Sequence, residues 1–344
     1  MTKRYLGNII TQNPTAPTDN FETTSAAGVW SLAEAFAYSK AGLWPTAGNA
    51  APTWYGNRAL MAGGLSGSYY NSIDYITITS AGNASDFGDL TMTSRSPESA
   101  VSNASRGVFI NLYNNPNTNR IDYVTIATTG NAADFGDAYY TTVNIMAVSD
   151  GTKGFILGGN SAGTDISTIT IASTGNAVDW GGDASVTLRR AGGATGSSTR
   201  GLFIGGISSS GTYGNLITYM TFATVGDTVD FGDLGTAVYY NNSTGSDVRA
   251  LSMGGYNSSN DEISTMEYVT IATTGNATSF GDLARGTVLA GATSNNVTGI
   301  YAGGYDGASM RNEIQQFTIA ATGNATDFGD LTAARSGCAT TSGN

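Results

Sequence analysis

The sequence has no histidine, one cysteine and few prolines and charges, and these shortages exclude several classes of protein. Without histidine the chain lacks the commonest general base and metal ligand, which excludes Ser-His-Asp and Cys-His catalysis and histidine-bound zinc. A single cysteine, Cys338, excludes an intrachain disulfide framework and a cysteine metal cluster. Only carboxylates, lysine and tyrosine remain for acid–base chemistry.

Charge is scarce and mostly negative. Charged residues make up 12% of the 344 residues, and 26 acidic against 15 basic side chains give a formal net charge of −11. This balance disfavours binding to a nucleic-acid backbone or to anionic lipid. The sequence contains no apolar run near 18 residues and no signal-peptide core at its start. We therefore expect a soluble protein with no nucleic-acid partner and no membrane insertion.

Glycine, by contrast, is abundant, and many of its 47 copies belong to an internal repeat. The phrase T-G-N-A-x-D-F-G-D-L recurs six times with variations, and its aromatic residues are 45 to 51 positions apart. A second landmark, an apolar run that ends in Gly-Gly, recurs in five units and reads Asn111-Leu112 in another. The aromatic positions of the six units are Phe87, Phe135, Trp180, Phe231, Phe280 and Phe328.

The length of the repeat predicts a β-propeller. Residues 57–344 comprise 288 positions, six times 48, and units of this length with several short strands are typical of propeller blades. The last unit lacks a Gly-Gly strand, while 57–64 form such a strand with nothing before it. We therefore predict an all-β, six-bladed propeller over 57–344. Pairing of 57–64 with the C-terminal strand would close the ring and remove both sheet edges.

The repeat resembles the kelch family of β-propellers. That family carries a glycine doublet after an apolar strand, then an aromatic residue on the next strand, then a tryptophan. The tryptophan position here holds phenylalanine except at Trp180, and the strand aromatic is Tyr75, Tyr123, Tyr219 or Tyr268. The resemblance implies a kelch-like propeller. No local pattern assembles a catalytic site on it, so we expect a non-enzymatic protein without catalytic residues, metal or cofactor.

The first 56 residues differ in composition from the rest, because they hold four of the six prolines and three of the four tryptophans. Prolines oppose a helix in 1–28, whereas S-L-A-E at 31–34 is a capping box and Gly42 is a stop signal. We predict an N-terminal extended arm and one short helix over 1–56. Its apolar residues either cover one face of the propeller or anchor the chain to another protein; the anchoring candidates are Trp30, Leu32, Phe36 and Trp44.

Two motifs resemble proteins of tailed bacteriophages. The stretch G-V-W-S-L followed by A-G-L-W-P is similar to one in their structural proteins, and the repeat is similar to kelch-like repeats in virion proteins of marine and cyanobacterial phages. This implies a virion protein, assembled in the host cytoplasm, whose N-terminal segment binds other virion proteins. The propeller would be a tail, fibre or capsid appendage that contacts a host-surface glycan or protein. The alternatives are an internal plug or spacer in the tail or neck, and a glycan-active enzyme.

The repeats differ most between the Gly-Gly strand and the strand that follows it. Equivalent loops of a propeller emerge on one face, and these are rich in tyrosine, asparagine, serine and glycine, a composition typical of recognition surfaces. Each tyrosine could equally belong to a solvent loop without a partner. The candidate ligand- or partner-binding residues are Tyr69, Tyr70, Tyr113, Tyr213, Tyr256 and Tyr305.

Two further repeated features carry charge. Acidic turns such as Asp86 with Asp89 suggest either a cation site or carboxylates that stabilise a turn, and their repetition in every unit favours the turn. Arginines stand just before the Gly-Gly strand. They suggest an anion site or, as we expect, ion pairs with the acidic turns; they are Arg58, Arg106, Arg200 and Arg249.

Overall fold

The computed structural model describes residues 55–94, 97–112, 118–160, 164–184, 191–208 and 210–344. All the secondary-structure elements in this part of the chain are β-strands, so its architecture is all-β. None of its elements is a helix that could cross a membrane. The predicted arm and short helix lie outside the described residues, as do Trp30, Leu32, Phe36 and Trp44.

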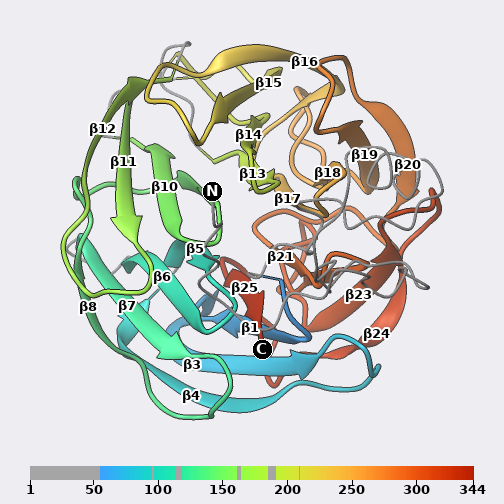
Figure 1. The fold of residues 1–344 in the computed structure, drawn as a ribbon. Coiled ribbons are helices and arrows are strands. Elements are labelled where there is room, and N and C mark those ends of the chain that lie inside the picture. The colour runs from blue at the N-terminus through green and yellow to red at the C-terminus, as the bar shows by residue number, and fades with distance from the viewer. Residues whose placement is uncertain (1–54, 95–96, 113–117, 161–163, 185–190, 209) are drawn as a thin grey trace, which may run out of the picture. The chain divides into compact units, whose positions relative to one another are not determined.

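The strands form six antiparallel sheets arranged as blades around a central axis, which confirms the six-bladed propeller (Figure 1). The innermost strands of neighbouring blades contact one another all the way round. From the inside outward, blade 1 contains β25 (Ala339–Gly343), β1 (Arg58–Ala62), β3 (Ser68–Thr77) and β4 (Ser85–Ser94), with β2 (Leu65–Ser66) paired to β3. Blade 2 contains β5 (Pro97–Ser102), β6 (Arg106–Leu112), β7 (Arg120–Thr125) and β8 (Ala133–Asp137). Blade 3 contains β9 (Ile145–Ser149), β10 (Lys153–Gly158), β11 (Asp165–Thr170) and β12 (Val178–Asp183).

The other three blades repeat this order without the extra short strand. Blade 4 contains β13 (Gly193–Gly196), β14 (Arg200–Ile204), β15 (Gly214–Thr221) and β16 (Val229–Val238). Blade 5 contains β17 (Asn242–Gly245), β18 (Arg249–Met253), β19 (Thr265–Thr270) and β20 (Thr278–Asp282). Blade 6 contains β21 (Gly291–Ser294), β22 (Thr298–Ala302), β23 (Glu313–Thr318) and β24 (Thr326–Asp330).

Blade 1 is built from both ends of the repeat region. Strand β25 is its inner strand and pairs with β1 in a continuous register from Arg58 opposite Gly343 to Ala62 opposite Ala339. Asn57 also donates its backbone N–H to the Asn344 side chain at 3.0 Å. The C-terminal strand therefore supplies the partner that β1 would otherwise lack.

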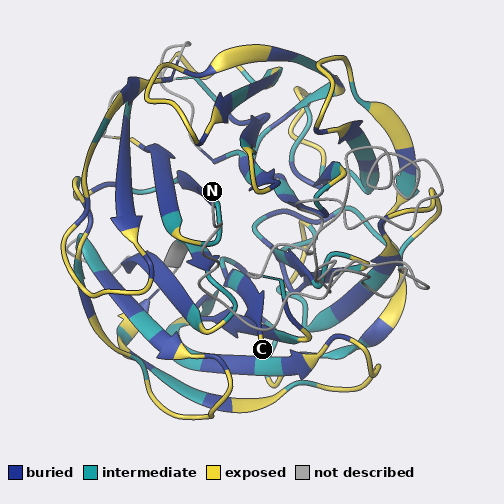
Figure 2. Cartoon of the chain, viewed as in Figure 1, coloured by how far each residue is buried: buried dark blue, intermediate teal, exposed yellow. Residues whose placement is uncertain are grey.

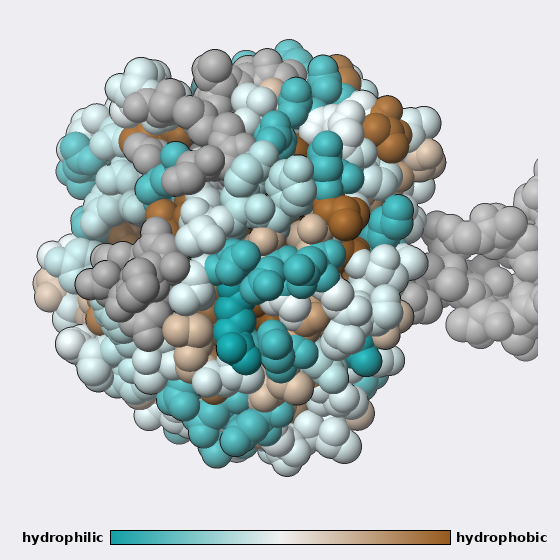
Figure 3. All heavy atoms as spheres, turned by 90° about the vertical axis from the view of Figure 1, so that its left-hand side faces the viewer, coloured by the Kyte–Doolittle hydropathy of each residue, from teal (hydrophilic) through white to brown (hydrophobic). Residues whose placement is uncertain are grey.

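The hydrophobic core lies between the blades. Strand β6 is buried on both faces from Gly107 to Leu112 (Figure 2). Val108 and Ile110 cluster with buried residues of blade 3, and Phe109 and Leu112 cluster with buried residues of blade 1. The side of the ring seen in Figure 3 shows polar and weakly polar residues with apolar ones only in small separate patches. Burial on both faces explains why the second strand of each unit reads as a continuous apolar run.

The T-G-N turn of the repeat is a hydrogen-bonded clasp between blades. The Asn131 side-chain oxygen accepts the backbone N–H of Asp89 in the preceding blade at 3.0 Å. The same bond recurs at all six blade junctions at 3.0 to 3.1 Å, with Asp227 in place of asparagine at one of them. The repeated phrase is thus a device that joins one blade to the next, which accounts for its six copies.

The glycine of D-F-G-D is required by this clasp. A Cβ atom on Gly281 would lie 2.2 Å from the carbonyl oxygen of Gly323 in the next blade. Gly281→Ala should therefore lower the free energy of unfolding by about 1–3 kcal/mol, as overpacking does elsewhere. The matched control is Gly323→Ala, because nothing lies within 4 Å of the added methyl group. Urea denaturation checks both, and equal stabilities for the two variants would contradict the clasp.

The arginines of the second strands stabilise the ring in a way that differs from our prediction. The Arg58 guanidinium lies 5.0 Å from the centre of the Tyr75 ring and donates to the carbonyl oxygens of Ile126 and Ala127 in the next blade, at 2.9 and 2.7 Å. The same pattern holds for Arg106, Arg200 and Arg249.

The predicted ion pairs of these arginines with the acidic turns are wrong. Among the described residues, no salt bridge involves any of the four. Backbone carbonyls just after the third strand of the next blade accept hydrogen bonds from the guanidinium instead. The ring of the tyrosine in the same blade covers the guanidinium through a cation–π contact.

The Gly-Gly doublet ends the second strand in five of the six blades. In blade 6 Gly303 and Gly304 have φ of +66° and +104°, and Gly304 donates its N–H to Arg335 O at 2.9 Å. The unit without a doublet keeps the left-handed backbone through Asn111, at φ +52°, since asparagine tolerates it better than most residues. The Asn111 amide donates to Thr142 O at 3.0 Å, so the departure of this unit from the repeat does not interrupt the ring.

A second clasp uses a polar side chain of the third strand. Asp122 accepts the backbone N–H of Thr91 in the preceding blade at 2.7 Å, and Asp74 accepts that of Thr332 at 2.8 Å. Both carboxylates are buried. Each has an arginine partner, but only Arg335, 2.8 Å from Asp74, is itself inaccessible to solvent, whereas the side chain of Arg120 is 39% exposed.

Candidate functional site

The propeller has two chemically different faces. We call one of them the loop face; it carries the loops that connect the second strand of each blade to the third, such as the loop that contains Gly304 and Tyr305. On the other, the termini face, lie the ends of the inner strands and both ends of the described chain. The Tyr55 hydroxyl donates to the carbonyl oxygen of Gly196, the last residue of β13, at 3.2 Å, and Asn344 bonds to Ala104 at 2.8 Å. The described part of the chain therefore begins and ends on the termini face.

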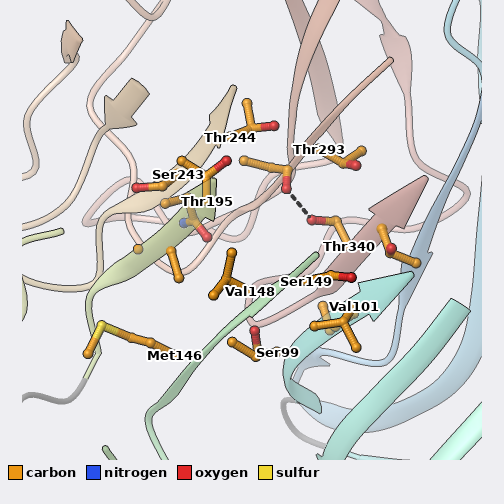
Figure 4. A pocket seen from close by; sticks show the side chains of 18 of the residues that line it. Ser99, Val101, Met146, Val148, Ser149, Thr195, Ser243, Thr244, Thr293 and Thr340 are labelled. Atoms are coloured by element: carbon orange, nitrogen blue, oxygen red, sulfur yellow. Dashed lines mark hydrogen bonds between the residues drawn. The ribbon is translucent and has the colours of Figure 1, made fainter. Parts of the chain in front are cut away.

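A channel of about 160 Å³ runs between the inner strands (Figure 4). Its lining is made of serine, threonine, glycine, alanine and other uncharged residues, and no described Asp, Glu, Lys or Arg is among them. Several hydroxyls donate to inner-strand carbonyls of the adjacent blade, such as Thr340 to Ala292 at 2.7 Å. These hydroxyls therefore bind neighbouring blades to each other, and the lining of the channel is polar but uncharged.

Asp247 lies in the hairpin between β17 and β18 on the termini face, where partial burial disfavours the charged form of its carboxyl group. Burial raises the pKa of its carboxyl group from 3.8 to about 6, although hydrogen bonds from Asn296 and the Ser198 backbone oppose the shift. Because the folded state holds this proton more tightly, stability is lost as the pH rises from about 4 to about 6. Asp247→Asn should raise the melting temperature at pH 7 and change it little at pH 4. An equal gain at both pH values would contradict this.

A ring of left-handed residues surrounds the loop-face end of the channel. In five blades the residue that leads into the inner strand has positive φ, from 53° to 73°. These residues are linked by four backbone hydrogen bonds, in which the N–H of one residue donates to the equivalent carbonyl of the preceding blade, as from Tyr240 to Ala191 at 2.6 Å. The members are Asn144, Ala191, Tyr240, Leu289 and Gly337; the sixth position falls between β4 and β5, outside the described residues.

Two of these residues hold large side chains in a conformation that disfavours them. The left-handed region costs a residue with a Cβ roughly 1–2 kcal/mol, and glycine avoids that cost. Gly337 adopts the same conformation and makes the same hydrogen bond, so the ring itself does not need the side chains of Tyr240 and Leu289. Such strain points to a role for the side chains themselves.

Both side chains line a hollow of about 410 Å³ at the mouth of the channel, which we call the cup. Its volume is within the range of about 300–1,000 Å³ that is usual for small-molecule sites. The amide of Asn144 donates to Asn160 Oδ1 at 3.1 Å and places polar atoms on one side. No described Asp, Glu, Lys or Arg lines the cup, and its larger side chains, all half-buried, are Leu65, Val143, Tyr240, Leu289, Tyr305 and Met310.

A group of stacked tyrosines supports the cup from blades 4 and 5. The Tyr213 and Tyr239 rings are parallel with centroids 4.6 Å apart, and Tyr239 also contacts Tyr256 at 5.2 Å and Tyr240 at 4.8 Å. The Tyr213 hydroxyl lies 2.5 Å from Asn260 Oδ1, which fixes the outer end of the stack. These contacts hold the Tyr240 ring against the wall of the cup.

Two tyrosines of this group, Tyr239 and Tyr256, keep their protons at neutral pH. Burial raises the pKa of Tyr239 to about 12, and the hydrogen bond with Tyr213 adds to the shift. Burial also raises the pKa of Tyr256, and the nearby Glu262 carboxylate contributes. Their hydroxyls are therefore hydrogen-bond donors rather than bases, and the stability they give is lost only above about pH 10, their ordinary pKa.

The predicted binding residues fall into three groups. Tyr305 lines the cup and donates to Gly307 O at 2.6 Å, and Tyr213 and Tyr256 belong to the stack behind it. Tyr69 and Tyr70 lie half-buried on β3 and do not line the cup; Tyr70 instead packs under the Arg335 guanidinium at 5.7 Å. Tyr113 lies outside the described residues.

The sequence interpretation missed Tyr239, Tyr240 and Leu289. They lie between the outer strand of one blade and the inner strand of the next, whereas the predicted binding residues come after the second strands. A Tyr-Tyr pair beside a glycine-rich repeat was the available signal. The left-handed backbone that turns Tyr240 and Leu289 toward the cup has no signature in the sequence, because it arises from hydrogen bonds between blades.

The acidic turns contribute bonds to the ring rather than a cluster of ligands. In the described part of the chain, no group of three or more histidine, cysteine, aspartate or glutamate residues could hold a metal ion. Burial raises the pKa of Cys338, which keeps its thiol protonated.

The cup is the concave site whose Tyr240 and Leu289 side chains are not needed for the hydrogen bonds between blades.

No protein-family model matches this chain, and no curated protein matches it either. Its function is therefore inferred from the site and from the motifs of the sequence.

Proposed function

We propose that this chain is a non-enzymatic structural protein of a tailed-bacteriophage virion, with a kelch-like propeller displayed as a tail, fibre or capsid appendage. The segment before the propeller, with Trp30, Leu32, Phe36 and Trp44, attaches it to another virion protein. The loop face is turned outward and contacts the host surface.

The observation that carries this proposal is the opposition of the two faces. Tyr55, where the described part of the chain begins, lies on the termini face, and the described chain also ends there. The cup and its tyrosines lie at the other end of the channel, on the loop face. An anchor on one face leaves the opposite face available for a second partner.

The division between repeated and variable residues also supports a binding role. The asparagines, glycines and arginines of the repeat hold one blade to the next. The residues of the cup differ from blade to blade; after the doublet stand Leu65, Asn160 and Tyr305. A ring that is stable through its repeated residues permits variation at the mouth, where recognition takes place.

The phage origin is supported by the two motif resemblances of the sequence, at opposite ends of the chain. The rigid, fully clasped ring would also suit the second candidate, an internal spacer of the tail or neck. In that case the half-buried apolar side chains of the cup would be covered by a neighbouring virion protein. An exposed cup in the particle would favour the appendage, and a covered cup would favour the spacer.

Incorporation into particles tests the anchor. Full-length Trp30→Ala and Trp44→Ala variants, supplied in trans to a phage that lacks the gene, should reduce the amount of protein in purified particles at least tenfold. Tyr305→Ala is the matched control, since it removes an aromatic ring from the cup; it should enter particles normally and reduce their adsorption to host cells. Immunoblots and adsorption rates measure the two effects. Normal incorporation of both tryptophan variants would refute the anchoring role.

A further inference from the structure

We propose that the cup binds a neutral sugar unit of a surface glycan, and that Tyr240 and Leu289 are kept in their strained conformation to make this contact. This inference rests on the proposed outward display of the loop face. It names the class of ligand that the site takes.

The first argument comes from the ring of left-handed residues. Gly337 makes the same inter-blade hydrogen bond as Tyr240 and Leu289, at 2.6 Å, and has no side chain. Glycine at all these positions would give a more relaxed ring. The hydrogen-bonded ring therefore does not require these two large side chains, and the cup is the surface that they share.

The second argument comes from the kinds of atoms around the cup. Pyranose rings have apolar C–H faces that pack on aromatic rings, and hydroxyls that exchange hydrogen bonds with amides and backbone groups. Tyr240 and Tyr305 supply aromatic rings to the lining of the cup, and Leu289 and Met310 supply apolar contact. Asn144 and Asn160 supply amide groups. A site that is mostly apolar with a few polar groups is the usual composition of a small-ligand pocket.

The third argument is the distribution of charge, which favours a neutral over an anionic sugar. No described charged residue lines the cup. Beside it, Asp306 and Arg311 flank the loop of Tyr305 and Met310, and they pair with each other at 3.1 Å. Arg285 pairs with Glu313 at 2.9 Å in the same network. The two arginines are thus balanced by two carboxylates, and no excess positive charge is left for a carboxylated or phosphorylated sugar.

The experiment measures binding and stability on the same full-length variants. The probes are biotinylated neutral oligosaccharides of glucose, galactose, mannose and rhamnose, with sialylated and glucuronylated ones for comparison, read by biolayer interferometry. We expect the wild-type protein to bind at least one neutral probe. Leu289→Gly should weaken that binding tenfold or more, with a melting temperature equal to or above that of the wild type. Tyr240→Gly should weaken the binding as much, and it also removes the ring contact with Tyr239.

The control is Ala104→Gly, at a left-handed position with φ +72° on the termini face. Ala104 lies outside both the cup and the ring of left-handed residues, so this variant should relax the backbone and leave the affinity unchanged. The proposal is overturned if no neutral probe binds at millimolar concentration, if only anionic probes bind, or if a virion protein proves to occupy the cup. It is also overturned if Leu289→Gly binds as the wild type does. Incorporation into particles is measured separately, so a cup without sugar leaves the virion assignment standing.

Discussion

A chain that lacks its last twelve residues, 333–344, should lose the cooperative unfolding transition of the propeller. The truncation removes β25, whose hydrogen bonds with β1 complete blade 1, and it removes Arg335. The edge of β1 and the buried side chains of Leu60 and Met61 would then face solvent. Unpaired strand edges promote association with other chains. We therefore expect a broad thermal transition by circular dichroism and oligomers in size-exclusion chromatography.

The control for this truncation is removal of Asn344 alone. Asn344 accepts a hydrogen bond from Asn57 and donates one to Ala104, so its loss should cost about 1 kcal/mol and leave the transition sharp. A truncated chain, 1–332, that melted like the full-length protein would show that the ring does not depend on its closing strand.

Arg335→Met should lower the free energy of unfolding by about 3–5 kcal/mol, the usual effect of removing one partner from a buried ion pair. The Arg335 side chain is fully buried, 2.8 Å from Asp74, and it donates to Ser72 Oγ at 2.7 Å. Without the guanidinium, the Asp74 carboxylate would remain buried with only its hydrogen bonds from Thr332. Denaturant unfolding measures the loss.

The matched control is Arg120→Met, next to the equivalent carboxylate of blade 2. Asp122 is as buried as Asp74 and accepts the same bonds, but Arg120 is partly exposed, so its removal should cost no more than about 1 kcal/mol. If Arg335→Met does not fold, the double variant with Asp74→Asn should restore folding, since a neutral amide still accepts the bonds from Thr332. Equal losses for Arg335→Met and Arg120→Met would contradict the special role of the buried pair.

The propeller could be predicted from the sequence because the same motif recurs in all six blades. Each blade needs the asparagine of T-G-N and the glycine of D-F-G-D for the same contact, so one physical constraint appears as a period of about 48 residues. The unpaired strand at 57–64 likewise predicted a partner at the other end of the chain, and β25 occupies that place.

The site was predictable only in part, because its residues are not repeated and their directions depend on contacts between blades. The loop tyrosines Tyr213, Tyr256 and Tyr305 were found from their position after the doublet. Leu289 and Tyr240 were not, since their left-handed backbone follows from the hydrogen-bonded ring. The arginines were assigned to the wrong partners for a similar reason: their acceptors are main-chain carbonyls, which leave no trace in a pattern of side chains.

A density map of the intact particle by cryo-electron microscopy would show where the propeller lies in the virion. We expect a six-bladed ring attached to the virion through its termini face, with the cup of Tyr240, Leu289 and Tyr305 open to solvent. Particles without this ring, or a ring whose loop face is buried against another virion protein, would contradict this expectation.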